Sequence, residues 1–232
     1  MARNLENWTG CPRPERTALE GRFTRLEPLS AARHGDGLFS AATIDDAAAR
    51  FTYLPEVPPP SRADFQSWLE TAQASDDPLY FVVIDKANGV IGGRQTLMRI
   101  TEAMGVIEIG HIYWGSQIAR TPVATEAFFL FARYVFDTLG YRRFEWKCDN
   151  ANEPSKRAAL RFGMTPEGVF RQAAVVKGRN RDTAWFSIID AEWPNIRDAF
   201  TQWLDPANFD AEGRQIRRLE EMRPERKSND QE

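Results

Sequence analysis

A helix start behind a polar turn is the first feature of this sequence that could do chemistry. Thr121 and Pro122 form an N-cap and first-position pair ahead of an apolar helical run over 123–139. The first backbone N–H groups of a helix have no partners within it and lie at the positive end of its dipole, so they favour phosphate. The sequence therefore predicts an anion-binding turn here.

The strand before this turn carries one acidic side chain, Glu108, and a glycine in mid-strand, Gly110. A positioned carboxylate can take a proton from a substrate. A glycine inside a strand indicates a bulge or a close approach to the backbone. Because alternation places Glu108 opposite Ile107 and Ile109, a solvent-facing carboxylate bonded to a neighbouring arginine is the alternative interpretation.

Three further features have both a structural and a chemical interpretation. His111 is interpreted as a strand histidine with satisfied hydrogen bonds, or as a base, since its ordinary pKa is near 6.5. Cys148 alternates with Trp146 and Phe144 and is interpreted as core, with a nucleophile as the alternative. The basic run at 177–181 is typical of a charged hairpin turn; alternatively it lies at the rim of the site and selects an acidic acceptor.

Composition excludes several classes of protein. The chain has 232 residues, 42% of them hydrophobic, which is enough for one substantial core. Thirty basic residues against 33 acidic ones give a formal net charge of −3, so nucleic acid is not an expected partner. The sequence has no run of roughly 18 apolar residues and no export signal, so neither a membrane partner nor secretion is expected. With two cysteines, the sequence favours cytoplasmic thiols over a disulfide framework.

Motifs that are missing narrow the chemistry further. The sequence has no phosphate loop of the G-x-x-x-x-G-K-S/T type, no G-x-G-x-x-G and no G-x-S-x-G elbow. Its histidines and cysteines have no metal-ligand spacing. Kinase, dinucleotide dehydrogenase and α/β-hydrolase functions are therefore disfavoured, and no metal site is predicted.

The helices and strands that position these residues are predicted to form an α+β fold, that is, a mixed αβ fold. We expect a central, mostly antiparallel, twisted sheet of about seven strands flanked by helices. Strands are predicted over 23–28, 79–84, 90–100, 105–114, 144–148, 164–176 and 183–189. Helices are predicted after Ser30 and Ser61, over 123–139, after Asn152, and over 194–204.

One domain is the economical count, because we find neither an internal repeat nor a second core. The predicted parts are an amino-terminal arm over 1–20, a domain over 21–190, a helical extension over 191–222 and a disordered tail over 223–232. The segment 193–203 and the arm carrying Trp8 could cover a dimer interface, so a homodimer is possible on this pattern.

Three pieces of sequence together resemble the GNAT superfamily of acyl-CoA-dependent N-acyltransferases, in the branch typified by RimJ and RimL. They are ATEA at 124–127 heading the long helix, the pair Asn152 and Ser155 followed by LRFGM at 160–164, and IEIGHIYW at 107–114 as the split central strand. The resemblance covers roughly 21–190. It implies a GNAT-like fold and acetyl-CoA as co-substrate.

The resemblance also implies roles for particular residues. Acetyl-CoA would lie where the strand at 108–114 splays from the strand at 144–148, with a backbone N–H near Ile112 or Tyr113 as oxyanion donor. Glu108 would draw the proton from the attacking amine through water, and Ser155 would protonate the departing sulfur. Asn152 would hold the pantetheine amide. Cofactor contacts are predicted at Ile112, Tyr113, Trp114, Ile118, Arg120, Thr121, Val123, Ala124, Thr125, Asn152 and Ser155. As ordinary alternatives, Ser155 is a first-turn helix residue and Asn152 an N-cap.

One departure from the family pattern concerns the phosphate loop. The family has Arg or Gln, two residues, Gly, one residue, then Gly or Ala, and this chain has proline at the first glycine position, Pro122. Proline has no N–H, so one phosphate contact is lost, and Arg120 or Thr121 could supply a side-chain donor instead.

The functional expectation is transfer of an acetyl group to a primary amine of a peptide amino terminus or a small molecule, by direct attack in a ternary complex. The alternative is a domain that binds acyl-CoA as a sensor or scaffold without turnover, which the altered loop makes conceivable. A weaker alternative is a nucleotide-binding module that uses the same helix start. The sequence leaves the acceptor itself open.

Overall fold

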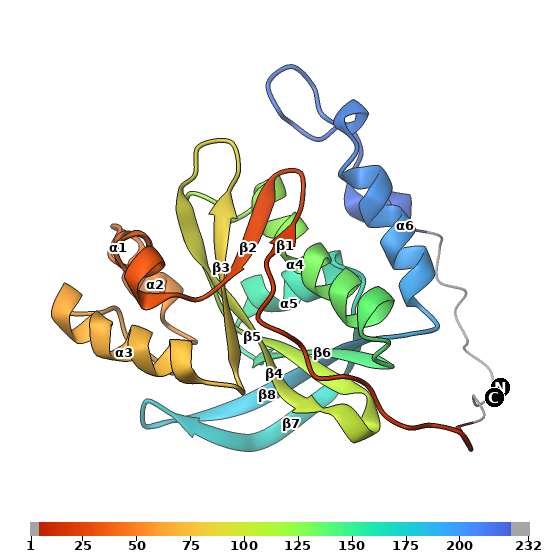
Figure 1. The fold of residues 1–232 in the computed structure, drawn as a ribbon, viewed down its shortest axis with the longest axis horizontal. Helices are drawn as coiled ribbons and strands as arrows, with labels where there is room; N and C mark the ends of the chain where they lie inside the picture. The colour runs from red at the N-terminus through yellow and green to blue at the C-terminus, as the bar shows by residue number, and fades with distance from the viewer. Residues whose placement is uncertain (1–4, 224–232) are drawn as a thin grey trace.

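The computed structural model describes residues 5–223 and contains one sheet of eight strands. The strands lie in the order β1, β2, β3, β4, β5, β6, β8, β7, and all neighbours are antiparallel except β5 and β6 (Figure 1). Their bounds are Leu19–Glu20, Thr24–Pro28, Leu79–Asp85, Ile91–Thr101, Val106–Trp114, Arg143–Asp149, Thr165–Val176 and Arg179–Ile189 for β1 to β8. The predicted mixed αβ class is confirmed. The strand beyond the expected seven is the two-residue β1, which belongs to the predicted arm.

Apart from the short α2, the main helices begin within one residue of where the sequence predicts them. They are α1 at Ala31–Ala42, α2 at Ala47–Arg50, α3 at Arg62–Ala74, α4 at Pro122–Arg133, α5 at Glu153–Arg161 and α6 at Trp193–Trp203. The side chains of Ser30, Ser61, Thr121 and Asn152 each accept a first-turn N–H as N-caps. The sequence analysis missed the short α2. The predicted helix over 123–139 continues from α4 through a π-helical turn, Tyr134–Thr138.

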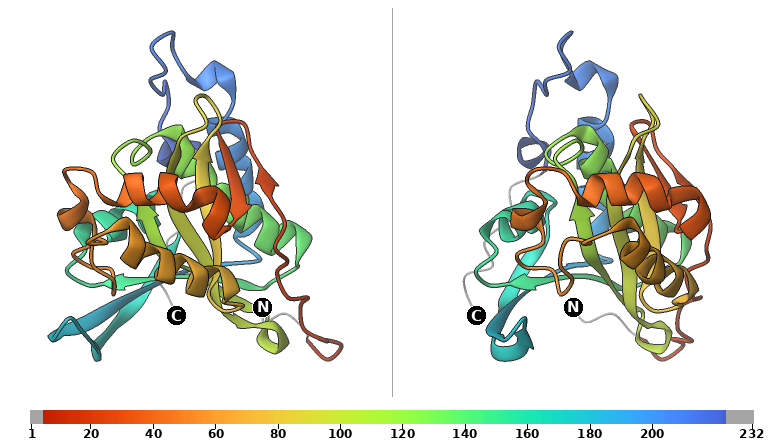
Figure 2. Two further views of the ribbon diagram at one scale, coloured as in Figure 1. Left: turned by 60° about the vertical axis from the view of Figure 1, so that its left-hand side comes forward. Right: turned by 90° about the vertical axis from the view of Figure 1, so that its left-hand side faces the viewer.

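Helices cover both faces of the sheet (Figure 2). Helices α1 and α3 pack on one face, around a cluster that includes Leu38, Leu69 and Val82. Helices α4 and α6 pack on the other face, within the larger core. There the ring of Phe128 on α4 stacks on Phe162, which directly follows α5, with centroids 4.4 Å apart. This aromatic contact packs the middle of α4 against the end of α5.

Helix α6 packs into its own chain. Trp193 and Trp203 are both 3% exposed and donate hydrogen bonds to Asp137 and Gln215. They therefore do not supply the dimer surface suggested for 193–203. Trp8 in the arm is half-buried and donates to the Ala103 carbonyl. Of the predicted tail, 224–232 lies outside the described residues.

Candidate active site

The parallel strand pair in the middle of the sheet separates partway along its length. β5 and β6 pair in register from Val106 with Arg143 to Ile109 with Trp146. Beyond that point, β5 pairs with β4 alone among the described strands, and β6 continues with β8. We call the opening between 110–114 of β5 and 147–149 of β6 the notch. Its inner edges carry backbone groups that no neighbouring strand satisfies, and these can bond an extended ligand.

A bulge at the predicted glycine opens the notch. His111 has φ of +45°, and the register between β4 and β5 shifts between Gly110 and Tyr113. A bulge bends its strand and increases the local twist. A Cβ on Gly110 would overlap the sulfur of Met98, so a side chain at this position would require the Met98 side chain to move.

Hydrogen bonds between β4 and β5 identify which backbone groups face the notch. Gly115 N–H donates to Gly92 O at 2.8 Å, and such bonded pairs alternate along antiparallel strands. Two residues earlier, Tyr113 is therefore again bonded to β4, whereas Ile112 and Trp114 direct backbone groups toward the notch. Of the two predicted oxyanion donors, this pattern favours Ile112.

The start of α4 has the predicted cap. Thr121 Oγ1 donates to Ile118 O at 2.7 Å and accepts from Val123 N–H at 3.2 Å, while Pro122 occupies the first helical position. This hydroxyl hydrogen is therefore already used within the turn. Arg120 is exposed with φ of +65°, so its guanidinium is the better placed side-chain donor for an anion.

A half-buried cation on α5 contacts the first turn of α4. Arg161 Nη1 donates to Thr125 Oγ1 at 3.0 Å, and Thr125 Oγ1 donates to Thr121 O at 3.2 Å. Burial lowers the pKa of Arg161, yet a guanidinium stays charged in proteins. The sequence analysis missed Arg161, because only the packing of α5 against α4 brings it here. The predicted cofactor residues Ile118, Val123 and Ala124 are buried, so only their backbones can serve a ligand.

Ser155 and Asn152 lie at the start of α5, beside the notch. Asn152 Oδ1 accepts from Ser155 N–H at 3.1 Å, so Asn152 is an N-cap whose side-chain nitrogen is not used by the cap. Ser155 Oγ accepts from Trp146 Nε1 at 2.9 Å, and the Ser155 side chain is also within hydrogen-bonding reach of Cys148. Cys148 is buried in the core, as predicted, and burial raises the pKa of its thiol.

Glu108 lies in a buried ion cluster, not alone in its strand and not facing solvent. Lys147 Nζ lies 2.8 Å from Oε2 of Glu108 and 2.8 Å from Oε2 of Glu145, and Arg99 Nε lies 3.0 Å from Oε2 of Glu108. Burial raises the pKa of Glu108, and the charges of Lys147 and Arg99 only partly oppose this. A raised pKa suits a group that accepts a proton near neutral pH.

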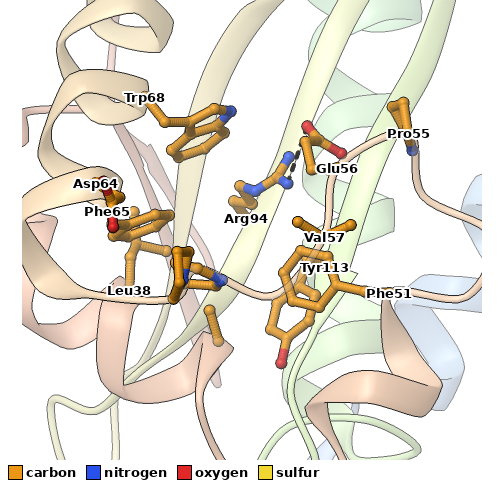
Figure 3. A pocket seen from close by; sticks show the side chains of 13 residues that line it. Leu38, Phe51, Pro55, Glu56, Val57, Asp64, Phe65, Trp68, Arg94 and Tyr113 are labelled. Carbon is orange, nitrogen blue, oxygen red and sulfur yellow. Dashed lines mark ion pairs between the residues drawn. The ribbon is translucent and has the colours of Figure 1, made fainter. Parts of the chain in front are cut away.

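A pocket of about 340 Å³ opens on the α1 and α3 side of β5 (Figure 3). Arg94 Nη2 and His111 Nδ1 each lie 3.2 Å from Oε1 of Glu56. His111 thus has the satisfied hydrogen bond that its structural interpretation requires. Glu56 and Arg94 were not predicted from the sequence, because no motif marks them.

The turn between β7 and β8 approaches the same pocket. Lys177 and Gly178 have φ of +52° and +73°, so the hairpin-turn interpretation of 177–181 is confirmed. Lys177 Nζ also donates to the carbonyl of Phe51, a residue of the pocket wall, at 2.8 Å. The hairpin therefore supports the segment that shapes the pocket.

The mixed sheet has a split parallel strand pair, and beside it lies a helix start whose N–H groups can bind phosphate. This arrangement is typical of an acyltransferase-like αβ domain. Comparisons with known proteins agree. The model of the acetyltransferase (GNAT) domain family matches residues 24–165. A GCN5-related N-acetyltransferase from Brucella melitensis is 61% identical, with 94% of this chain and 99% of that chain covered and a TM-score of 0.93. A candidate GNAT-family acetyltransferase from Chromobacterium violaceum is 39% identical over 84% of this chain and 96% of its own, with a TM-score of 0.77.

A third structure shares the fold alone. The microcin C7 self-immunity acetyltransferase MccE, solved with acetyl-CoA and AMP, has a TM-score of 0.64 at 21% identity, over 73% of this chain and 93% of its own. No curated protein matched this chain.

The chain belongs to the GNAT acetyltransferase family, whose members transfer an acetyl group from acetyl-CoA. Its residues fit that co-substrate, because the notch offers unpaired backbone groups for an extended arm and the start of α4 offers N–H groups for phosphate. Over residues 5–223, no group of three metal-ligating side chains occurs. In the same span, no helix is long and apolar enough to cross a membrane.

Proposed function

We propose that this protein acetylates a primary amine, on a peptide amino terminus or a small molecule, by direct attack on acetyl-CoA in a ternary complex. The observation that carries the proposal is the notch, which opens beside the start of α4 and faces an acceptor-sized pocket. Direct attack needs both substrates bound at once, and the notch and the pocket are separate places for them.

Acetyl-CoA supplies an activated acetyl group as a thioester. Backbone groups of Ile112 and Trp114 bind its extended arm, and the N–H groups of the first turn of α4, with Arg120, hold the phosphates. The N–H of Ile112 stabilises the negative charge that develops on the thioester oxygen.

Two side chains move protons in this proposal. Glu108 accepts the proton of the amine through water, on a buried carboxylate whose Oε2 lies beside Lys147 and Arg99. As the C–S bond breaks, Ser155 donates its hydroxyl hydrogen to the departing sulfur and takes the remaining proton of the attacking nitrogen in its place, while its oxygen also accepts from Trp146. Asn152 directs its side-chain nitrogen to the pantetheine amide.

We also propose membership of the RimJ/RimL-like branch, supported by the ATEA and Asn152–Ser155 motifs. A candidate ribosomal-protein-serine acetyltransferase from Vibrio cholerae shares the fold at 17% identity, with a TM-score of 0.65. That name suggests a protein as one class of acceptor to test.

Thiol release from acetyl-CoA over a panel of primary amines tests the function. We expect amine-dependent release, and we expect Ser155→Ala to lower kcat at least about tenfold, with acetyl-CoA binding retained in a thermal-shift assay. Binding without release for any amine would instead support the sensor alternative. Competition by ATP, with no effect of desulfo-CoA, would support a nucleotide-binding module.

A further inference from the structure

The pocket beside β5 is walled mainly by apolar side chains (Figure 3). Its polar lining side chains are Glu56, Asp64 and Arg94, and Asp64 already accepts a hydrogen bond from Ser61. The apolar walls come from α1, α3, β5 and the segment after α2, and they include Leu38, Phe51, Val57, Phe65, Trp68 and Tyr113. Such a pocket favours a ligand with a bulky apolar group, because apolar surface is removed from water on binding.

The charge of Arg94 is already compensated. Its guanidinium pairs with Glu56, donates to His111 O at 3.0 Å and lies over the ring of Trp68, 4.5 Å from the centroid. The Arg94 side chain is also 5% exposed. The pocket therefore does not present a free cation to a carboxylate, and an acidic acceptor is disfavoured.

One carboxylate oxygen of Glu56 has no hydrogen-bond partner among the described residues. Arg94 and His111 both contact Oε1, and His111 must donate there, because a carboxylate only accepts. Oε2 is buried without a hydrogen-bond partner among the described residues. Burial alone would raise the pKa of Glu56, but the hydrogen bond from His111 and the charge of Arg94 outweigh it and lower the pKa to about 2. Oε2 is therefore an ionised acceptor that lacks a donor, which is costly unless a ligand supplies one.

The pocket and the notch meet at β5. Tyr113 forms part of the pocket wall, and its neighbours Ile112 and Trp114 face the notch. The segment after α2 spans the split in the sheet, because Tyr53 Oη donates to Ala151 O at 3.1 Å beyond the end of β6. An amine held in this pocket would therefore lie next to the place proposed for the thioester.

We propose that this pocket is the acceptor site, that it selects primary amines bearing a bulky apolar group, and that Oε2 of Glu56 receives an N–H of the amine. The inference rests on the proposed function and deepens it. Two sources share this chemistry, namely a free hydrophobic amine and a peptide whose first residue is apolar. The fixed negative charge binds the amine in its cationic form, and the proton leaves through the separate proton acceptor, Glu108.

The test compares acceptors that differ in apolar bulk. We expect kcat/KM for phenethylamine to exceed that for ethylamine at least about tenfold. Peptides beginning with Phe, Gly or Asp distinguish the two sources: a preference for the Phe peptide over phenethylamine favours a protein terminus, and the reverse favours a small molecule. Equal rates for phenethylamine and ethylamine would overturn the pocket proposal but not the acetyltransferase, whereas no release with any amine would overturn both.

Glu56→Gln tests the oxygen directly. We expect the KM for phenethylamine to rise at least about tenfold, with kcat within about threefold and the KM for acetyl-CoA unchanged. Glu70→Gln is the matched control, because Glu70 is exposed on α3 outside the pocket lining. An unchanged amine KM in a folded Glu56→Gln protein would sink the assignment.

A second variant avoids the risk that Arg94, left without its partner, unfolds the protein. Val57 lines the pocket and is 62% exposed, so Val57→Lys should fold and place a cation that competes for Glu56. We expect the KM for phenethylamine to rise at least about fivefold. Val90→Lys, in the turn between β3 and β4, is the control. If Val57→Lys uses phenethylamine as well as this control does, the pocket is not the acceptor site.

Discussion

Two carboxylates at the split strand, Glu108 and Glu56, both lie beside basic side chains, yet their pKa values are shifted in opposite directions. Each has one oxygen contacted by two groups, Lys147 and Arg99 for Glu108, and Arg94 and His111 for Glu56. In Glu108 burial dominates and raises the pKa, whereas in Glu56 the contacts outweigh burial and lower the pKa to about 2.

This difference in pKa indicates that one carboxylate accepts the proton and the other binds the amine. A carboxylate with a raised pKa is a better proton acceptor near neutral pH, and one with a very low pKa stays an anion through the working range. Environments that push two pKa values apart assign the two groups to different roles. We therefore assign the proton to Glu108 and the amine to Glu56, and the following variants test that division.

The largest expected effect is on kcat in Glu108→Gln. Removing the proton acceptor should lower kcat about 100-fold while the KM for the amine changes little. Glu145→Gln is the matched control, because Glu145 lies opposite Glu108 on β6 and binds the same lysine. Comparable losses in both variants would mean that the ion cluster, not Glu108, supports turnover. Thermal unfolding of both proteins checks that each is folded.

The pH profile separates the two carboxylates. A base works only when deprotonated, so kcat should fall as the pH falls through the raised pKa of Glu108, above its ordinary 4.5. Glu56 should add no step above about pH 4, since its pKa is about 2. We expect this acid step to persist in Glu56→Gln and to vanish from the residual activity of Glu108→Gln. An acid step lost in Glu56→Gln instead would reverse the assignment.

The affinity for acetyl-CoA should change independently of both carboxylates when the start of α4 is altered. Pro122→Ala restores an N–H at the first position of α4, so we expect the Kd for acetyl-CoA to fall about three- to tenfold. Calorimetric titration measures this, with the KM for the amine as the internal control. An unchanged Kd would show that the phosphates do not use this N–H.

The smallest effect should come from Arg99→Met. The charge of Arg99 lowers the pKa of Glu108, so its removal should move the acid step of kcat to higher pH. The Arg99 side chain is 64% exposed, which limits the shift to less than about one pH unit. Arg16→Met, which breaks an arginine–aspartate pair in the arm, should leave the step in place. A shift toward lower pH would contradict the proposed coupling.

The helix start and the strand bulge that we propose bind the cofactor were predictable from sequence, because their signals are local. Thr121 with Pro122 specifies a helix start within one turn, and Gly110 marks the bulge that opens the notch. The acceptor side had no such signal. Glu56 stands in a proline-rich connection and Arg94 in a strand, and only chain folding brings them to 3.2 Å.

The sequence by itself determined where helices and strands begin, through capping side chains, turn glycines and apolar alternation, and it determined the family through motifs that lie close together in the chain. The tertiary structure alone decided the charge environment of each carboxylate. A pKa depends on burial and on charges within a few ångströms, and those neighbours come from strands and loops far apart in sequence: Lys147 for Glu108, and Arg94 with His111 for Glu56.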